Sequence, residues 1–280
     1  MDNNVAQAVL KTLAYYDLFA YPVTLQELHR YLIASRVVSL QQVKNELNRL
    51  QISKKNNFYF LKGKDAIVAQ RIKREKISHK KLQLAKKIAT RLSRIPTIVY
   101  IGVSGSLAMQ NAKKNDDIDL FIITKPYTLW ISRLLASLLL VVTGKLRRFG
   151  QVEQRDAICL NMWVETRYMK FKERRQNVYT AHEIVQLYTL YNQYHTYEQF
   201  LYANTWITQV LPHTIIHKVH VTRFPSSKSM RILNTIVKKM QMWYMKQHKT
   251  SETISDGFVA FHPMDYTQKI LQSWKEQTVS

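Results

Sequence analysis

Apolar residues in the first 63 positions recur at the spacing of three short helices. The run from Val5 to Phe19 predicts the first helix. Two further helix starts have capping-box spacing, Thr24 with Glu27 and Ser39 with Gln42, which satisfies free amide groups at a helix N-terminus. We therefore expect three helices before residue 52.

A short strand pair follows the third helix. The dipeptide Asn56-Asn57 precedes the β-prone residues Phe58 to Leu61, which predicts a hairpin. Three helices and a hairpin are the order of a winged helix. In that arrangement the third helix and the wing present five side chains to nucleic acid: Lys44, Asn45, Arg49, Lys54 and Lys55. Winged helices also bind proteins, so both roles stay open.

Residues 64–94 predict one long helix with a strongly basic outer face. The segment contains eleven Lys or Arg residues, and its only acidic residues are Asp65 and Glu75. A basic face of this kind has two interpretations: it binds a nucleic-acid backbone, or it is an ordinary helix surface in contact with solvent.

Buried strands are expected in the middle of the chain. Three apolar runs have strand length: Ile98 to Ile101, Phe121 to Ile123 and Ala157 to Val164. Leu129 to Val142 predicts a buried helix, because it is short for a membrane span and contains Arg133.

Helical spacing dominates the last third of the chain, at residues 181–190, 197–210, 228–246 and 267–274. We therefore predict an α+β fold in three parts. These are a winged-helix-like domain at residues 1–63, a core at 64–167 that begins with the long basic helix, and a helical C-terminal region at 168–280.

The charge balance favours an anionic partner. The 280 residues include 42 Lys or Arg and 19 Asp or Glu, a net charge of +23, which attracts nucleic acid, triphosphates or an anionic membrane. A lysine-rich proteome would give the same balance.

We recognise no signal peptide and no membrane span, so we expect a cytoplasmic protein without a membrane partner. The single cysteine, Cys159, indicates a reducing compartment, and we expect no catalysis by it.

Two adjacent patterns predict a site for phosphate and metal. A strand ends and a helix begins at Gly105-Ser106, where backbone amides, the helix dipole and the Ser106 hydroxyl suit phosphate oxygens. Asp117 and Asp119 stand two apart at the start of a strand, so both carboxylates share one face, whereas Asp116 points to the other. Paired carboxylates bind Mg²⁺ or Mn²⁺, which stabilises charge during phosphoryl transfer.

The order strand, Gly105-Ser106, short helix, Asp117-Ile118-Asp119-Leu120, strand resembles the nucleotidyltransferase superfamily, which has the DNA polymerase beta-like fold. The resemblance implies a mixed sheet flanked by helices. It also implies that Asp117 and Asp119 are catalytic metal ligands, that Gly105 and Ser106 hold an NTP, and that a nucleoside monophosphate is transferred to an acceptor.

A wider resemblance is to uncharacterised bacterial proteins with a winged-helix-like N-terminus before a nucleotidyltransferase domain. It extends over four segments: Thr12 to Asp17, Phe58 to Gly63, Tyr179 to Glu183 and Asn204 to Trp206. It implies a fold and a reaction class, with no established substrate.

The chain departs from the superfamily pattern in two places. Gln110 stands where many members have glycine. Active members usually add a third carboxylate from a later strand, and the corresponding segment offers only Asp156 at its edge and the neutral Asn161 in its middle. A site with two carboxylates is active, weak, or retained for binding.

Three functions therefore stay open. The first is nucleotidyl transfer to an unidentified acceptor, such as RNA, DNA, a small molecule or a protein. The second is a winged-helix regulator that binds DNA and senses a nucleotide without turnover. The third is an antitoxin-like nucleotidyltransferase that acts on a partner protein.

Two weaker patterns accompany this site. His213, His217 and His220 would align on a helix, either as metal ligands or as a surface row. An aromatic run would stack bases or form a helical core with its hydroxyls at the solvent: Tyr188, Tyr191, Tyr194, Tyr197, Phe200 and Tyr202.

Overall fold

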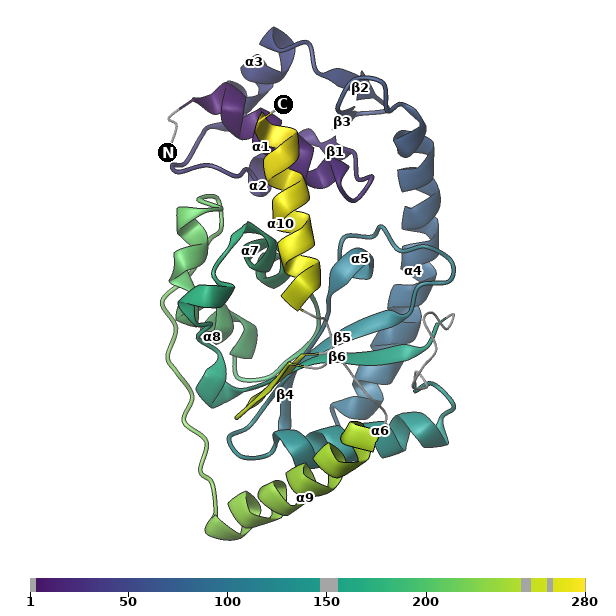
Figure 1. Ribbon diagram of the computed structural model, residues 1–280, viewed down its shortest axis with the longest axis vertical. Helices are drawn as coiled ribbons and strands as arrows, with labels where there is room; N and C mark the ends of the chain where they lie inside the picture. The colour runs from purple at the N-terminus through teal and green to yellow at the C-terminus, as the bar shows by residue number, and fades with distance from the viewer. Residues whose placement is uncertain (1–3, 147–155, 248–252, 261–263, 280) are drawn as a thin grey trace.

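The computed structural model describes residues 4–146, 156–247, 253–260 and 264–279. It is a mixed α+β structure, in which a small N-terminal module stands above a six-stranded sheet (Figure 1). The long helix α4 (Ala66–Leu92) runs along one side of the molecule and connects the two parts (Figure 1).

The N-terminal module contains three helices and a three-stranded antiparallel sheet in the order β1-β3-β2. The elements are α1 (Val5–Asp17), β1 (Val23–Thr24), α2 (Leu25–Arg30), α3 (Leu40–Arg49), β2 (Ser53–Lys55) and β3 (Phe58–Phe60). Both predicted capping boxes are confirmed. The hairpin turns at Asn56 and Asn57 as predicted, and both residues have positive φ angles, which asparagine tolerates better than most residues.

Helix α4 confirms the long helix expected at residues 64–94, but its basic residues do not all face solvent. Arg71 and Lys81 are both 3% exposed. Each lies on the packed face, where carboxylates and carbonyl oxygens surround it. The expectation that the basic residues of this segment lie on an outer face is therefore wrong for these two positions, because their charges are paired inside the protein.

The main sheet has the strand order β7-β4-β5-β6-β9-β8. Its strands are β4 (Ile98–Val103), β5 (Ile118–Thr124), β6 (Ile158–Glu165), β7 (Tyr188–Asn192), β8 (Thr253–Ser255) and β9 (Phe258–Ala260). Only β5 and β6 are parallel; the other neighbours in this sheet are antiparallel. The three strands expected from the apolar runs are all present.

Helices cover both faces of this sheet. The remaining helices are α5 (Gly105–Ala108), α6 (Leu129–Val142), α7 (Val178–Val185), α8 (Thr196–Ala203), α9 (Lys228–Gln247) and α10 (Met264–Val279). Short 3-10 turns lie at Thr166–Tyr168, Glu173–Arg175 and Thr205–Gln209. Apolar residues of α4, α6 and α9 pack on one face, and Phe200 of α8 packs on the other. In the described part of the chain, no helix has the length and apolar character to span a bilayer.

The last third of the chain is less helical than expected. Helix α7 ends at Val185, and Tyr188–Asn192 form β7 on the edge of the sheet. The backbone groups on the outer edge of β4 need partners, and this pairing overrides the weak helical periodicity. Two more strands, β8 and β9, extend the opposite edge. The aromatic run is accordingly a strand, a turn and a helix, not one helical core.

The predicted helix through the three histidines is also absent. Residues 212–227 contain no helix, so His213, His217 and His220 are not aligned. Instead, the His213 ring lies 4.1 Å from the ring of His29, and its Nε2 accepts a hydrogen bond from the Val38 amide. The loop conformation therefore removes the basis for a three-histidine metal site.

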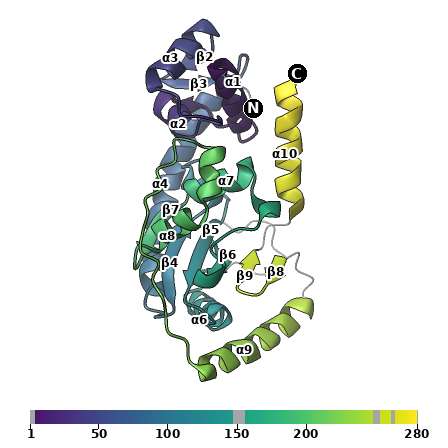
Figure 2. The ribbon, with the colours of Figure 1, turned by 90° about the vertical axis from the view of Figure 1, so that its left-hand side faces the viewer.

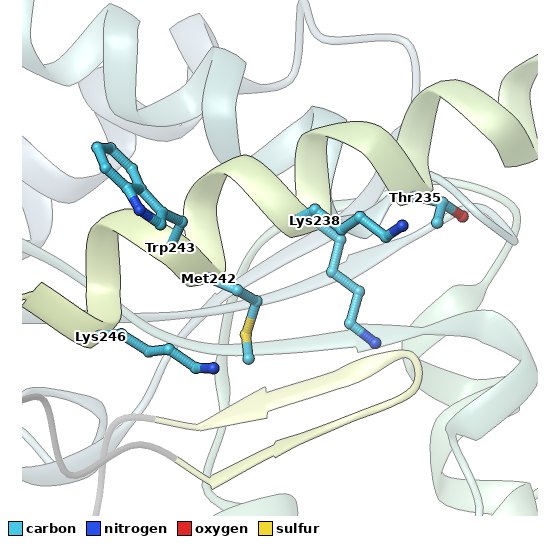
Figure 3. A pocket seen from close by; sticks show the side chains of 6 residues that line it. Thr235, Lys238, Met242, Trp243 and Lys246 are labelled. Atoms are coloured by element: carbon cyan, nitrogen blue, oxygen red, sulfur yellow. The ribbon is translucent and has the colours of Figure 1, made fainter.

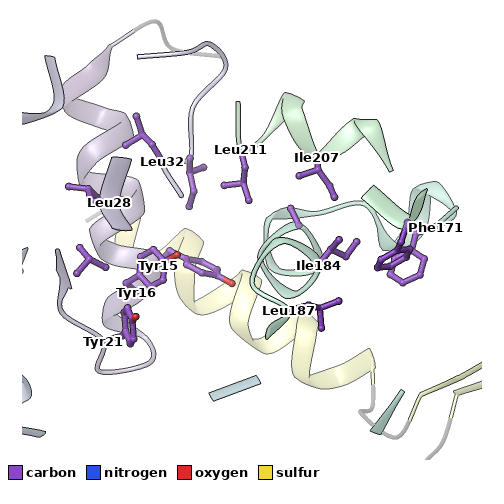
Figure 4. Close-up of a cluster of buried hydrophobic side chains, with 14 of the residues drawn as sticks. Tyr15, Tyr16, Tyr21, Leu28, Leu32, Phe171, Ile184, Leu187, Ile207 and Leu211 are labelled. Atoms are coloured by element: carbon purple, nitrogen blue, oxygen red, sulfur yellow. The ribbon is translucent and has the colours of Figure 1, made fainter. Parts of the chain in front are cut away.

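One hydrophobic core joins the N-terminal module to the sheet. Tyr15 and Tyr16 of α1 belong to the same buried cluster as Ile184 of α7 (Figure 4). The cluster also includes Phe121 of β5. Helix α10 lies along α1 and α7 (Figures 1 and 2), and Trp274 donates a hydrogen bond to the carbonyl of Lys11. The module is thus packed against the unit that carries the predicted site.

Candidate functional site

The turn that follows β4 places the predicted phosphate-binding residues beside β5. The Ser104 amide donates a hydrogen bond to the carbonyl of Asp119 at 3.0 Å. Gly105 then adopts a φ of +63°, and the short helix α5 begins. Positive φ favours glycine, because a Cβ atom crowds the backbone in that conformation.

Asp119 faces this turn directly. Its Oδ2 lies 3.5 Å from the point where a Cβ atom on Gly105 would stand. The structure therefore brings together two residues that the sequence places fourteen positions apart. A small group that enters beside Gly105 would meet both the turn and the carboxylate.

Replacing Gly105 by alanine is expected to destabilise the protein by about 1 kcal/mol, because alanine is strained at this φ. The added methyl group would also occupy the space in front of Asp119. Urea unfolding measures the first effect. Gly63→Ala is the matched control, since Gly63 has a φ of +84° with no atom within 4 Å of its added Cβ. If Gly105→Ala and Gly63→Ala matched in every nucleotide or metal binding measurement, the space beside Gly105 would have no binding role.

The Ser106 hydroxyl, which is expected to bind phosphate, contacts a carboxylate in this structure. It donates to Oδ2 of Asp116 at 3.1 Å, and the Lys113 amide donates to the same oxygen at 2.8 Å. Asp116 therefore closes the loop between α5 and β5. Ser106 is exposed, so a phosphate can approach its hydroxyl only by competing with Asp116.

Asp156 does not join the two predicted metal ligands. The Lys81 ammonium donates to Oδ1 of Asp156 at 2.8 Å and to the carbonyl of Asp116 at 2.6 Å. Asp156 thus neutralises a buried lysine and fixes the start of β6 against the loop. Its role in the described contacts is electrostatic support.

Cys159 of β6, rather than Asp156, lies beside Asp119. In the parallel pair of β5 and β6, Asp119 lies opposite Cys159. Ligand atoms of Asp117, Asp119 and Cys159 all lie within 4.8 Å of one another, and all three residues are half-buried. Cys159 could not be predicted as a neighbour of Asp119, because the local pattern of two strands far apart in the chain does not reveal their register.

Asn161 lies next to this group. Its side chain is 2% exposed, and its Nδ2 approaches the Ser104 hydroxyl at 3.5 Å. Because the Ser104 backbone amide bonds to the Asp119 carbonyl, this contact brings the Asn161 amide to the turn that Asp119 faces. Its buried Oδ1 has no hydrogen-bond partner.

Gln110 adopts a left-handed conformation with a φ of +55°. This angle is a physical reason for glycine at the corresponding position of the resembling proteins. The Gln110 amide donates to the carbonyl of Leu107, and Arg71 donates to the carbonyl of Met109 at 3.1 Å. The loop after α5 is therefore held against α4.

Two tyrosine side chains, Tyr179 of α7 and Tyr266 of α10, lie near the site. Burial raises the pKa of Tyr179 above its usual value, and the nearby carboxylates of Glu183 and Asp119 raise it further. The Tyr179 and Tyr266 rings are 6.0 Å apart, which brings α10 to the same place. Burial raises the pKa of Glu183 to about 7. Tyr179 and Glu183 belong to a segment that the resemblance singled out without a role.

Adjacent residues of α7 give opposite dependences of stability on pH. Burial lowers the pKa of His182 to about 4, so folding excludes a proton and stability rises between pH 4 and 6.5. The raised pKa of Glu183 has the reverse effect, and stability falls between pH 4.5 and 7. Each effect is at most about 3 kcal/mol.

We therefore expect Glu183→Gln to gain stability relative to the wild type as pH rises from 4.5 to 7. His182→Asn should lose the rise in stability between pH 4 and 6.5. Urea unfolding at several pH values gives both slopes. Slopes of the same sign in the two variants would contradict these assignments.

The donor set fits a divalent cation only in part. The carboxylates of Asp117 and Asp119 suit Mg²⁺ or Mn²⁺, which prefer oxygen ligands. The sulfur of Cys159 does not suit Mg²⁺. The two predicted carboxylates thus lie close together, but the third possible donor atom beside them is the Cys159 sulfur rather than a carboxylate oxygen.

A hollow on the protein surface lies along α9. It is lined by Thr235, Lys238, Lys239, Met242, Trp243 and Lys246 (Figure 3). These residues include no carboxylate, histidine or cysteine, which are the usual protein ligands of divalent metal ions.

Comparisons with known proteins give no match: no protein family, no curated protein and no solved structure matches this chain.

Proposed function

We propose that the protein is a nucleotidyltransferase, which transfers a nucleoside monophosphate from an NTP to an acceptor hydroxyl. The observation that carries the proposal is the position of Asp119 against the Gly105 turn, where its Oδ2 lies 3.5 Å from the point that a Cβ atom on that glycine would occupy. Phosphate-binding backbone and metal-binding carboxylates need this proximity, because the cation and the triphosphate must meet.

Each residue has a separate task in this proposal. The Gly105 turn and the Ser106 hydroxyl bind phosphate oxygens, and Asp117 and Asp119 hold a divalent cation. When bound, the cation would neutralise negative charge on the triphosphate. The acceptor hydroxyl loses its proton to solvent and its oxygen bonds to the α-phosphorus, the bond from that phosphorus to the bridging oxygen breaks, and pyrophosphate leaves.

The surrounding positive charge supports a polyanionic acceptor. Lys113 and Lys114 are exposed in the loop that Asp116 closes, and the net charge of the chain is +23. Positive potential raises the local concentration of nucleotides and nucleic acids. RNA is therefore the first acceptor to test, and a protein side chain is the alternative.

A second function, DNA binding with nucleotide sensing, is favoured by the N-terminal module. We propose that this module is a winged helix with α3 as its contact helix. Its candidate contact residues are exposed: Lys44, Asn45, Arg49, Lys54 and Lys55. Helix α3 lies at the end of the molecule farthest from α9 (Figure 1), so the main sheet does not block it.

The experiment that separates the two functions is pyrophosphate release. Each NTP is incubated with the full chain, Mg²⁺ or Mn²⁺, and mixed RNA or duplex DNA. Release supports the transferase. Nucleotide binding by calorimetry without release, together with duplex binding that survives excess unrelated DNA, supports the sensor.

A further inference from the structure

The residues around Asp119 include one donor that the nucleotidyltransferase resemblance does not supply. Cys159 faces Asp119 across the only parallel strand pair of the described sheet. Together with Asp117, these residues offer two carboxylate oxygens and one sulfur within 4.8 Å of one another.

The upper limit of this spacing exceeds that of a single tetrahedral coordination sphere by about 1 Å. Zinc bonds to oxygen and sulfur ligands at about 2.0 to 2.3 Å, so ligand atoms on one tetrahedral ion lie about 3.3 to 3.8 Å apart. Small rotations of half-buried side chains would close the remaining distance. The three atoms are therefore grouped for one ion.

Asn161 provides an independent observation. Its Oδ1 is buried and has no hydrogen-bond partner, although buried polar atoms are usually satisfied. The Nδ2 atom of the same amide approaches the hydroxyl of Ser104, whose backbone amide bonds to the Asp119 carbonyl. A buried oxygen without a partner beside this pair favours a bound cation, because positive charge there would compensate for the missing hydrogen bond.

We propose that Asp117, Asp119 and Cys159 bind a thiophilic divalent transition-metal ion of the Zn²⁺ class, in preference to Mg²⁺. The inference rests on the proposed function, because it specifies the metal of the same site. Sulfur ligands select Zn²⁺ and related ions, whereas Mg²⁺ requires hard oxygen ligands in octahedral geometry. A sulfur in place of the third carboxylate therefore changes which ion binds.

Cobalt(II) gives a readout that is independent of catalysis. The full chain, without an affinity tag and stripped of metal by a chelator, is titrated with Co²⁺. A thiolate ligand produces a sulfur-to-cobalt charge-transfer band in the near ultraviolet. Because Cys159 is the only cysteine in the chain, such a band has one source. The wild type is expected to show it at one ion per chain.

Two variants of Cys159 sharpen the test. Cys159→Ser keeps the size of the side chain but should abolish the band and weaken Zn²⁺ binding in calorimetry by at least ~10-fold, since even outer-shell changes weaken metal binding by about 10- to 100-fold. Its Mg²⁺ affinity should not fall. Cys159→Asp should abolish the band and strengthen Mg²⁺ binding by about tenfold, because it completes a set of three carboxylates.

Two results would overturn the inference: no charge-transfer band in the wild type, or equal Zn²⁺ affinity in the wild type and Cys159→Ser. The Asp119→Asn variant distinguishes this failure from failure of the proposed function. If Asp119→Asn abolishes binding of Mg²⁺ or Mn²⁺ while Cys159→Ser changes nothing, the carboxylate site stands and only the role of sulfur is wrong. If Asp119→Asn also leaves all metal binding unchanged, both proposals fail.

Discussion

Changing both Asp117 and Asp119 to asparagine is expected to abolish metal-dependent pyrophosphate release, with a loss of at least ~10³-fold. That loss corresponds to about 4 kcal/mol of transition-state stabilisation. Asparagine keeps the shape of aspartate but removes the negative charge that holds a cation. The measurement is the rate of pyrophosphate release at saturating NTP, with metal affinity followed in parallel by calorimetry.

Asp256→Asn is the matched control for this double variant. Asp256 is a carboxylate in the exposed turn of the β8–β9 hairpin, where it pairs with Lys238. It should release pyrophosphate at the wild-type rate. Equal activity in the Asp117→Asn/Asp119→Asn variant and in Asp256→Asn would show that the two carboxylates have a structural role only.

The second large effect is expected at Arg71, whose replacement by methionine should lower the free energy of unfolding by about 3 kcal/mol. The Arg71 side chain is 4% exposed and donates to Glu27 at 3.0 Å and to Glu75 at 3.2 Å. Its guanidinium also lies 3.8 Å from the centre of the Tyr21 ring. Methionine fills a similar volume but leaves these partners without their cation.

Arg71 joins three parts of the molecule, so its loss should have consequences beyond stability. Glu27 belongs to the N-terminal module, and Met109, whose carbonyl accepts from Arg71, belongs to the loop after α5. Urea unfolding measures the main effect. Arg49→Ala is the control, because the exposed pair of Arg49 with Glu46 should contribute less than about 1 kcal/mol. Similar losses in both variants would contradict the role assigned to the buried network.

The parts of the fold that depend on neighbouring residues could be predicted from sequence. The capping pairs Thr24 with Glu27 and Ser39 with Gln42 form as expected, and so does the turn at Asn56-Asn57. Each feature is fixed within about four residues, where side-chain and backbone chemistry act directly. The spacing of Asp117 and Asp119 belongs to the same class, because alternation along one strand places both carboxylates.

The parts that depend on distant pairing could not be predicted. Strand β7 exists because β4 needs a partner on its outer edge, and the local pattern of Tyr188–Asn192 does not require it. Lys81 and Asp156 meet although 75 positions separate them, so neither the buried charge nor its pairing with Asp156 was apparent. The proximity of Cys159 to Asp119 likewise follows from strand register alone.

We propose that the site around Asp119 transfers a nucleoside monophosphate. The most direct test uses NTPs labelled with ³²P at either the α- or the γ-phosphate, incubated with the full chain, a divalent cation and mixed RNA or candidate protein acceptors. We expect the α-label to enter a covalent product while the γ-label is released as pyrophosphate. Transfer of the γ-label, or tight nucleotide binding with neither label transferred to any acceptor, would contradict it.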